Sequence, residues 1–195
     1  MKELSLNVLD ITKNSVKAGA TLISISLVEV GNRLTMTITD NGCGMKPEIV
    51  AGVINPFYTT RTTRKVGMGI PLLILAAEQT GGGVTVESRH EEDHPEDHGT
   101  VVTATFFTDH IDFTPIGDLV STMETLIMGS PEIDFTFLHD RNGQAVELDT
   151  RDLREVLGDV PLDSYEVIQW IGQFIREQYD SPESPVHLLE ANNQT

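Results

Sequence analysis

The sequence predicts an α+β fold, and three patterns in its first half indicate this. Apolar side chains recur every three or four positions over residues 3–18, as they do in helices, and a continuous apolar run over residues 70–77 predicts a second helix behind Gly69. Residues 21–30 and 33–39 alternate in polarity on either side of a Gly31-Asn32 pair, which predicts a β-hairpin. Two further alternating segments, 84–88 and 100–107, follow the second helix. The predicted order is therefore helix–strand–strand–loop–helix–strand–strand.

The first helix carries two different faces. A stripe formed by Leu4, Val8 and Ile11, continued by Ser15, is expected to be buried, and Gly19 is suited to a left-handed C-terminal cap. A second face carries an amide, a carboxylate, a second amide and an ammonium group. Two interpretations of this face are open. It is either the solvent-exposed side of an amphipathic helix or a set of groups able to hold Mg²⁺, a water and a phosphate. Its residues, at intervals of three, four and three, are Asn7, Asp10, Asn14 and Lys17.

A basic, glycine-rich zone from Asp40 to Gly69 interrupts an otherwise acidic chain. It reads DNGCGM and later NPFYTTRTTRKVGMG, and no Asp or Glu occurs from Ile49 to Ala77, although the formal net charge is −17. A short helix is expected from Pro47, and a longer one from Ile70 to Thr80. Glycines let backbone N–H groups approach phosphate oxygens, and a following helix N-terminus adds partial positive charge. These features predict a site for an anionic small ligand, such as a nucleotide.

Composition excludes several classes of function. The chain of 195 residues is long enough for one sizeable core, with room for a small appended unit. An acidic protein is repelled by phosphate backbones, so we expect no nucleic acid partner. No apolar run approaches the roughly 20 residues that span a bilayer, so we expect no membrane partner. The single cysteine, Cys43, and the absence of a signal pattern fit a cytoplasmic protein.

The second half of the chain is more acidic, and its sequence patterns indicate its structure and role less clearly. Residues 1–107 carry 9 basic and 12 acidic side chains, whereas residues 108–195 carry 4 and 18. Within it we expect helices at 115–128, 150–157 and 163–179, and strands at 133–138 and 145–148. We expect the tail 181–195 to be flexible. The histidine-containing run EEDHPEDH at 91–98, in the first half, reads as a solvated loop between two strands, with a metal site as the alternative.

Four motifs in order resemble those of the GHKL ATPase superfamily, which includes histidine kinases, MutL-type ATPases, type II topoisomerases and heat-shock chaperones. LDITKNSVKAGAT resembles the N box, DNGCGM the first glycine box, NPFYTT the phenylalanine box, and GMG with IPLLILAAEQTGG the second glycine box. HGTVVTATF is similar to the closing strand of histidine-kinase catalytic domains, the closest branch. The resemblance implies a Bergerat-type two-layer α/β sandwich, a mixed sheet with helices on one face.

The resemblance also implies roles for individual residues. Asp40 would accept the adenine amino group, and Gly42 and Gly44 would let the chain pack under the base. Asn14 would coordinate Mg²⁺, Lys17 would touch a phosphate, and Asp10 stands where hydrolytic members place the carboxylate that activates water. Gly67 and Gly69 would cradle phosphate, with the lid cations Arg61, Arg64 and Lys65 facing it. The remaining residues expected around the nucleotide are Phe57, Thr60, Met68, Ile70 and Thr100.

The resemblance covers residues 3–107, so we expect an ATP-binding domain over 1–108, an acidic α+β region over 109–180 and a tail over 181–195. Histidine kinases carry their phosphoacceptor on a helical hairpin before this domain, and the N box here begins almost at residue 1. HIDFTPI at 110–116 resembles the pattern around that histidine only in part, and we expect coincidence or a structural role for His110.

Three function classes remain open from the sequence. We expect an ATP–Mg²⁺-dependent kinase for signal transduction, which phosphorylates a partner protein in trans as anti-sigma kinases do. The alternatives are a slow ATPase switch in which Asp10 is the general base, and a nucleotide-sensing module without catalysis. The C-terminal region is expected to dock the partner protein or to form a homodimer.

Overall fold

The computed structural model of the chain describes residues 2–54 and 68–181. The first half folds in the predicted order, and each boundary lies within two residues of the expected one. Gly19 has the positive φ, 75°, that was expected after the first helix. The elements are α1 (Leu4–Lys17), β1 (Leu22–Val30), β2 (Arg33–Asp40), α2 (Pro47–Ile54), α3 (Gly69–Gln79), β3 (Gly83–Arg89) and β4 (Gly99–Phe107).

The second half holds the expected helices and strands, but its first helix starts later than residue 115. Gly117 has φ 81°, and Asp118 is the N-cap whose carboxylate accepts the Ser121 N–H at 2.9 Å. The helix therefore begins only at Leu119, because the chain turns at Gly117 and the cap follows it. The elements are α4 (Leu119–Gly129), β5 (Asp134–Arg141), β6 (Gln144–Asp149), α5 (Thr150–Leu157) and α6 (Tyr165–Asp180).

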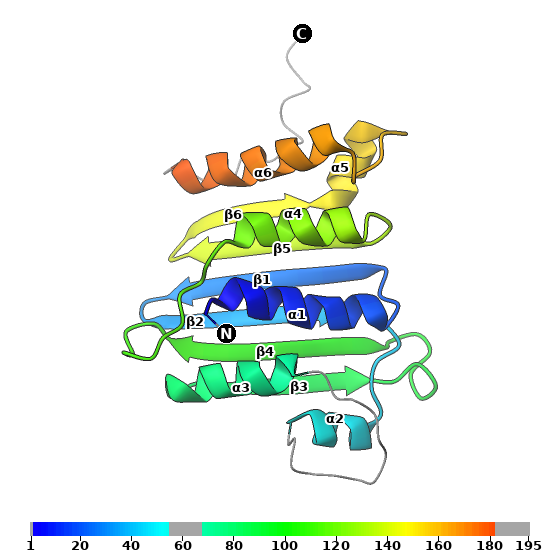
Figure 1. Cartoon of the computed structure of the whole chain (residues 1–195). Helices are drawn as coiled ribbons and strands as arrows, with labels where there is room; N and C mark the ends of the chain where they lie inside the picture. The colour runs from blue at the N-terminus through cyan, green and yellow to red at the C-terminus, as the bar shows by residue number, and fades with distance from the viewer. Residues whose placement is uncertain (1, 55–67, 182–195) are drawn as a thin grey trace.

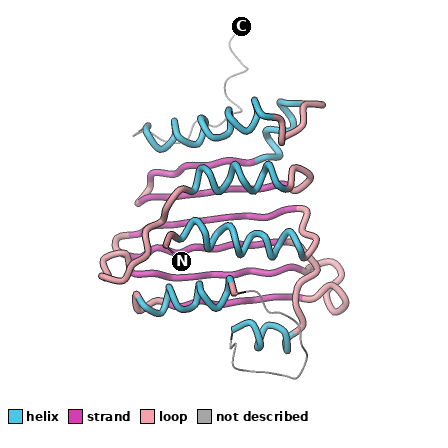
Figure 2. Tube along the Cα trace, viewed as in Figure 1, coloured by secondary structure: helices cyan, strands magenta, loops and turns pink. Residues whose placement is uncertain are grey.

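All six strands form one mixed sheet in the order β3-β4-β2-β1-β5-β6. β5 pairs in parallel with β1, while the other neighbours are antiparallel. The principal helices, α1, α3, α4 and α6, lie on the same side of this sheet (Figures 1 and 2). This arrangement confirms the α+β fold class and the two-layer sandwich. The expected division at residue 108 falls just after β4, and it stays a prediction about domain organisation.

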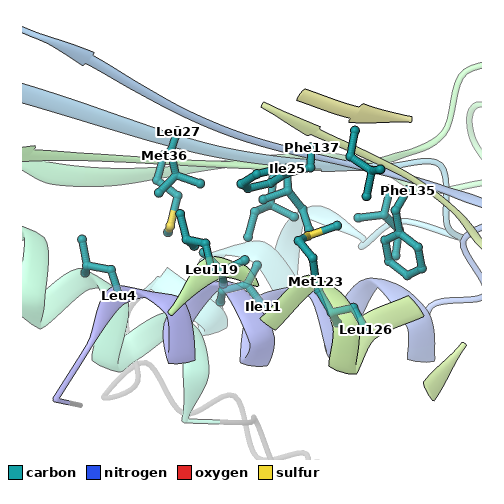
Figure 3. Packing of buried hydrophobic residues seen from close by; sticks show 14 of the residues in the cluster. Leu4, Ile11, Ile25, Leu27, Met36, Leu119, Met123, Leu126, Phe135 and Phe137 are labelled. Carbon is teal, nitrogen blue, oxygen red and sulfur yellow. The ribbon is translucent and has the colours of Figure 1, made fainter. Parts of the chain in front are cut away.

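The core lies between the sheet and this helix layer. Along β1 the residues facing the helices, Ile23, Ile25 and Leu27, are buried, whereas Ser24 and Ser26 on the other face are only half-buried. The alternation of apolar and polar residues along β1 thus indicates which face of the strand the helices cover. Figure 3 shows side chains from both halves of the chain meeting in this layer. They include Leu4, Ile11, Leu27 and Met36 from the first half, and Leu119, Met123, Phe135 and Phe137 from the second.

A polar cluster around the buried His139 connects β1, β5 and α6 at one end of the sheet. His139 Nε2 lies 2.9 Å from Glu29 Oε1, and His139 Nδ1 lies 2.8 Å from the Tyr179 hydroxyl. The Arg141 guanidinium lies 4.9 Å from the centre of the Tyr179 ring. Burial lowers the pKa of His139 below its ordinary value, against the opposing effect of Glu29, and burial raises the pKa of Tyr179. The imidazole is therefore neutral near pH 7, donating from Nε2 to Glu29 and accepting from Tyr179.

Candidate functional site: a nucleotide site between α1, β2 and α3

Three of the four polar residues predicted on one face of α1 are exposed. Asp10, Asn14 and Lys17 are each exposed to solvent. Asn7 differs, because only 1 % of its surface is exposed. The interpretation of this face as the solvent-exposed side of an amphipathic helix is therefore wrong at Asn7. The exposed trio forms a polar strip of a carboxylate, an amide and an ammonium group along the outer flank of the helix.

Asp40 is the last residue of β2 and is held by two donors. Only 8 % of its surface is exposed. Ser15 Oγ donates to Asp40 Oδ2 at 2.5 Å, and the Gly42 N–H donates to Asp40 Oδ1 at 2.9 Å. A buried carboxylate needs such donors to replace its lost hydration, and they fix its direction. Asp40 is thus a fixed acceptor at the junction of α1, β2 and the glycine turn.

The glycine turn after Asp40 fits closely against its neighbours. A Cβ on Gly42 would lie 2.9 Å from both the Cβ and the carbonyl oxygen of Ala18, at the end of α1. Gly44 has φ 67°, and a Cβ there would overlap the carbonyl of Arg89. The first position needs glycine for space, and the second needs it for both space and conformation. The turn therefore packs closely between α1 and the end of β3, beside Asp40.

The start of α3 lies against the polar strip of α1. Met68 is the N-cap and is 65 % exposed, while Gly69 and Ile70 are buried. A Cβ on Gly69 would lie 3.5 Å from Asp10 Cβ and 3.8 Å from Asn14 Nδ2. The first N–H groups of a helix have no partner within the helix and carry partial positive charge. The structure thus brings Asp10 and Asn14 together with an anion-attracting helix end.

Strand β4 supports the glycine turn from the other side. Thr100 is buried and faces Asp40 in the β2–β4 register, and its hydroxyl lies 2.8 Å from Ser88 Oγ. Ser88 Oγ also accepts the Met45 N–H at 2.7 Å. Thr100 therefore fixes the turn through Ser88.

The loop 91–98 also contacts this turn, since His98 Nδ1 lies 2.6 Å from the carbonyl oxygen of Gly42. Lys46 pairs with Glu92 at 2.5 Å, and this pairing lowers the pKa of Glu92. No three His, Cys, Asp or Glu side chains within residues 2–54 and 68–181 are arranged to hold a metal ion. Within the described part of the chain, the contact of the loop that bears on the site is therefore the one from His98 to the glycine turn.

Part of the predicted site lies outside the described residues. These positions belong to the segment between α2 and α3, and their predicted roles stay predictions. They are Phe57, Thr60, Arg61, Arg64, Lys65 and Gly67.

Three residues of the site were not predicted from the sequence, namely Ser15, Ser88 and His98. Ser15 had a readable signal, because a hydroxyl in the otherwise apolar stripe of Leu4, Val8 and Ile11 requires a buried partner. Ser88 and His98 lacked one, because their contacts depend on how β3 and its loop return to the turn.

A family profile agrees with this architecture. The family described as histidine kinase-, DNA gyrase B-, and HSP90-like ATPase matches residues 1–110, more than half of the chain. The chain belongs to this family. Its first 110 residues are thus a GHKL-type ATPase domain, and the predicted recognition is confirmed. Membership supports ATP binding by this domain.

One curated relative of the GHKL-type domain is the sensor histidine kinase ZraS of Salmonella typhimurium. It is 33% identical over 67 residues, which are 34% of this chain and 14% of that protein. The chain therefore matches only about a seventh of the length of this relative.

Solved structures share the fold beyond the GHKL-type domain. The MutL ATPase domain of Aquifex aeolicus complexed with ADP has a TM-score of 0.54 at 14% identity, covering 95% of this chain and 100% of that one. The N-terminal domain of a DNA repair protein has a TM-score of 0.58 at 16% identity, covering 82% and 58%. These similarities concern the fold, and the first covers nearly the whole chain.

No helix in the described residues is both long enough and apolar enough to cross a membrane.

Proposed function

We propose that this protein binds ATP with Mg²⁺ between α1, β2 and α3 and transfers the γ-phosphate to a partner protein in trans. The observation that carries the proposal is the placement of Asp10 and Asn14 against Gly69, at the N-terminus of α3, within a domain that also fixes Asp40. The ADP bound by the MutL domain of the same fold supports a nucleotide here as well.

Asp40 is proposed to recognise the adenine base. A carboxylate only accepts hydrogen bonds, so it matches the amino group of adenine and repels the carbonyl oxygen that guanine carries at the same position. Ser15 and the Gly42 N–H hold the two carboxylate oxygens at 2.5 and 2.9 Å. This fixed direction lowers the entropy lost when the base binds. Asp40 therefore favours ATP over GTP.

Asn14 and the start of α3 are proposed to hold the phosphates. The Asn14 amide offers the oxygen ligand that Mg²⁺ prefers, and its exposure leaves room for phosphate and water ligands. Mg²⁺ would neutralise part of the negative charge of the phosphates. The N-terminus of α3, whose first N–H groups have no partner within the helix, lies at the same region, and Lys17 adds a cation on the same flank. The residues present thus fit a magnesium–nucleotide complex.

Asp10 is proposed to receive the proton of the attacking group. In the transfer, the acceptor atom bonds to Pγ, the bond from Pγ to its bridging oxygen breaks, and ADP leaves with that electron pair. The proton lost by the acceptor passes to the Asp10 carboxylate. The exposed side chain of Asp10 is open to a partner's side chain or to water. Water as acceptor gives the alternative function, a slow ATPase switch.

His110 lies beyond the end of β4 that is far from Asp40, the carboxylate proposed to recognise the base. Asp40 faces Thr100 at the start of β4, whereas His110 follows Phe107 at the strand's other end. Seven residues of strand separate those ends by about 23 Å. We propose that the phosphoacceptor belongs to a partner protein. The acidic region 109–180 is proposed as the docking surface for that partner or for a second copy of the chain.

The test incubates the purified protein with Mg²⁺ and γ-labelled ATP or GTP, and follows nucleotide affinity, protein-bound label and free phosphate. We expect ATP to bind more tightly than GTP, and Asp40→Asn to weaken ATP binding sharply. Asp159→Asn, at an exposed position between α5 and α6, is the matched control. Equal ATP affinity in Asp40→Asn and the unmutated protein would refute the site.

The same incubation distinguishes the functions. Label on an added partner supports transfer, and partner-independent free phosphate supports the ATPase. Binding without either product identifies a nucleotide-sensing module.

A further inference from the structure

Asn7 carries a buried amide that has no hydrogen-bond partner among the described residues. The residue lies in the second turn of α1 and is 1 % exposed. Within the described ranges, neither its Nδ2 nor its Oδ1 finds a donor or acceptor. A buried amide without partners costs stability, and an apolar side chain of similar shape would avoid that cost. The stability of the ligand-free protein therefore does not explain why an amide occupies position 7, and we expect a functional reason.

The flank of α1 on which Asn7 lies is the one that faces the proposed phosphate site. Asn7 precedes Asn14 by two helical turns, and Asn14 lies beside Gly69 at the start of α3. Asp10 follows Asn7 by three residues, so the two side chains are neighbours on the helix surface.

Thr12 provides an internal comparison on the same helix. It is also fully buried, and its hydroxyl oxygen also lacks a partner among the described residues. However, it follows Ser5 by two turns, and the Ser5 N–H donates to the carbonyl of Ile116, just before α4. Thr12 thus lies on the flank away from Asp10 and α3. Its orphaned hydroxyl has no reacting group nearby, whereas the Asn7 amide does.

We propose that Asn7 is a positioning residue for Asp10. In the nucleotide-bound state its amide N–H donates to the Asp10 carboxylate and directs it at the group that attacks the γ-phosphate. Because the amide has no partner among the described residues of the free protein, it is available for this bond. This inference rests on the proposed function, because it assigns Asn7 a part in phosphate transfer or release and none in nucleotide binding.

The test compares Asn7→Leu with the unmutated protein in ATP affinity, kcat and melting temperature. Leucine has a similar shape and no polar atoms. We therefore expect the melting temperature to rise by about 2–4 °C, since removal of the buried amide stabilises a chain of this size. We expect kcat to fall about tenfold, as for loss of a hydrogen bond to a charged group. ATP affinity should stay unchanged.

Two further variants separate a positioning role from a structural one. Asn7→Thr restores a donor, and it should recover part of the lost kcat. Thr12→Val removes the other orphaned polar group of α1, and it should raise the melting temperature while leaving kcat unchanged. A change in kcat without a change in affinity, confined to position 7, is a result that packing alone does not produce.

The inference would be overturned if Asn7→Leu kept full kcat, or if it lowered the melting temperature as a packing mutation does. It would also be overturned if Thr12→Val reduced kcat equally. ATP binding without turnover by the unmutated protein would remove this inference and leave the nucleotide site standing. No ATP binding at all would instead refute the proposed function itself.

Discussion

Ser15 Oγ donates a 2.5 Å hydrogen bond to Asp40 Oδ2 across the interface between α1 and the end of β2. The two residues are 25 positions apart in the chain, and both are buried. The same helix presents Asp10 and Asn14 to the start of α3. A single hydrogen bond therefore ties the helix that carries the proposed phosphate residues to the carboxylate proposed to read the base.

Ser15→Ala should weaken ATP binding about tenfold, because hydrogen bonds to charged groups contribute about 1.5–3 kcal/mol and Asp40 retains its bond from Gly42. Calorimetric titration of both proteins with ATP and Mg²⁺ measures the difference. Ser26→Ala, on the half-buried open face of the sheet, is the control and should bind ATP normally. An unchanged dissociation constant for Ser15→Ala would show that Asp40 needs no support from α1.

Gly42→Ala should destabilise the fold by about 1–3 kcal/mol, because the new Cβ would lie 2.9 Å from two atoms of Ala18. Urea unfolding measures the loss. Gly129→Ala, at the end of α4, meets nothing within 4 Å and should be neutral or slightly stabilising. Equal stability of the two variants would mean that the turn moves away from α1 without cost.

The sequence predicted the elements of the first half well because their signals are local. The Gly31-Asn32 pair and the alternation around it determine the β1–β2 hairpin without reference to the rest of the molecule. The late start of α4 was missed, since the apolar pattern extends before Asp118 while the chain still turns at Gly117. The Asp118-to-Ser121 cap is also local, and it was the better signal.

The sheet order and part of the site could not be predicted in this way. The parallel pairing of β5 with β1 joins residues more than 100 positions apart, and no local pattern indicates it. Helical spacing placed Asn7 with Asp10 and Asn14, but it did not reveal that Asn7 is covered whereas the other two are exposed. Which residues of α1 are covered depends on the elements that pack against the helix, α3 and α4 among them, and their positions are set by the whole fold.

Asp10→Asn should leave ATP affinity unchanged and lower turnover by about 10²–10⁴-fold, the range for loss of a general base. The amide keeps the size of the carboxylate but does not take a proton. Single-turnover assays with γ-labelled ATP, beside an equilibrium binding assay, separate the two effects. Lys13→Gln, exposed on the same helix, is the control. Turnover equal to that of the unmutated protein would exclude Asp10 as the base.

Stability should depend on His139 below neutral pH. Burial holds the pKa of His139 in the folded protein below the ordinary value of about 6.5, which the unfolded chain retains. The unfolded state therefore binds more protons as the pH falls through this interval. The contribution is fully present above about pH 6.5 and is lost as the pH falls through the folded pKa. Urea unfolding followed by the fluorescence of Trp170, the single tryptophan, should show this loss.

His139→Gln tests that assignment, because glutamine can donate to Glu29 and accept from Tyr179 but takes up no proton in this range. The variant should therefore lose part of the fall in stability between pH 7 and 5. His94→Gln, exposed in the loop between β3 and β4, is the control and should keep the full pH dependence. The same slope in His139→Gln and the unmutated protein would place the titrating group elsewhere. A flattened slope would instead show that the buried contact among β1, β5 and α6 is where acid weakens the fold.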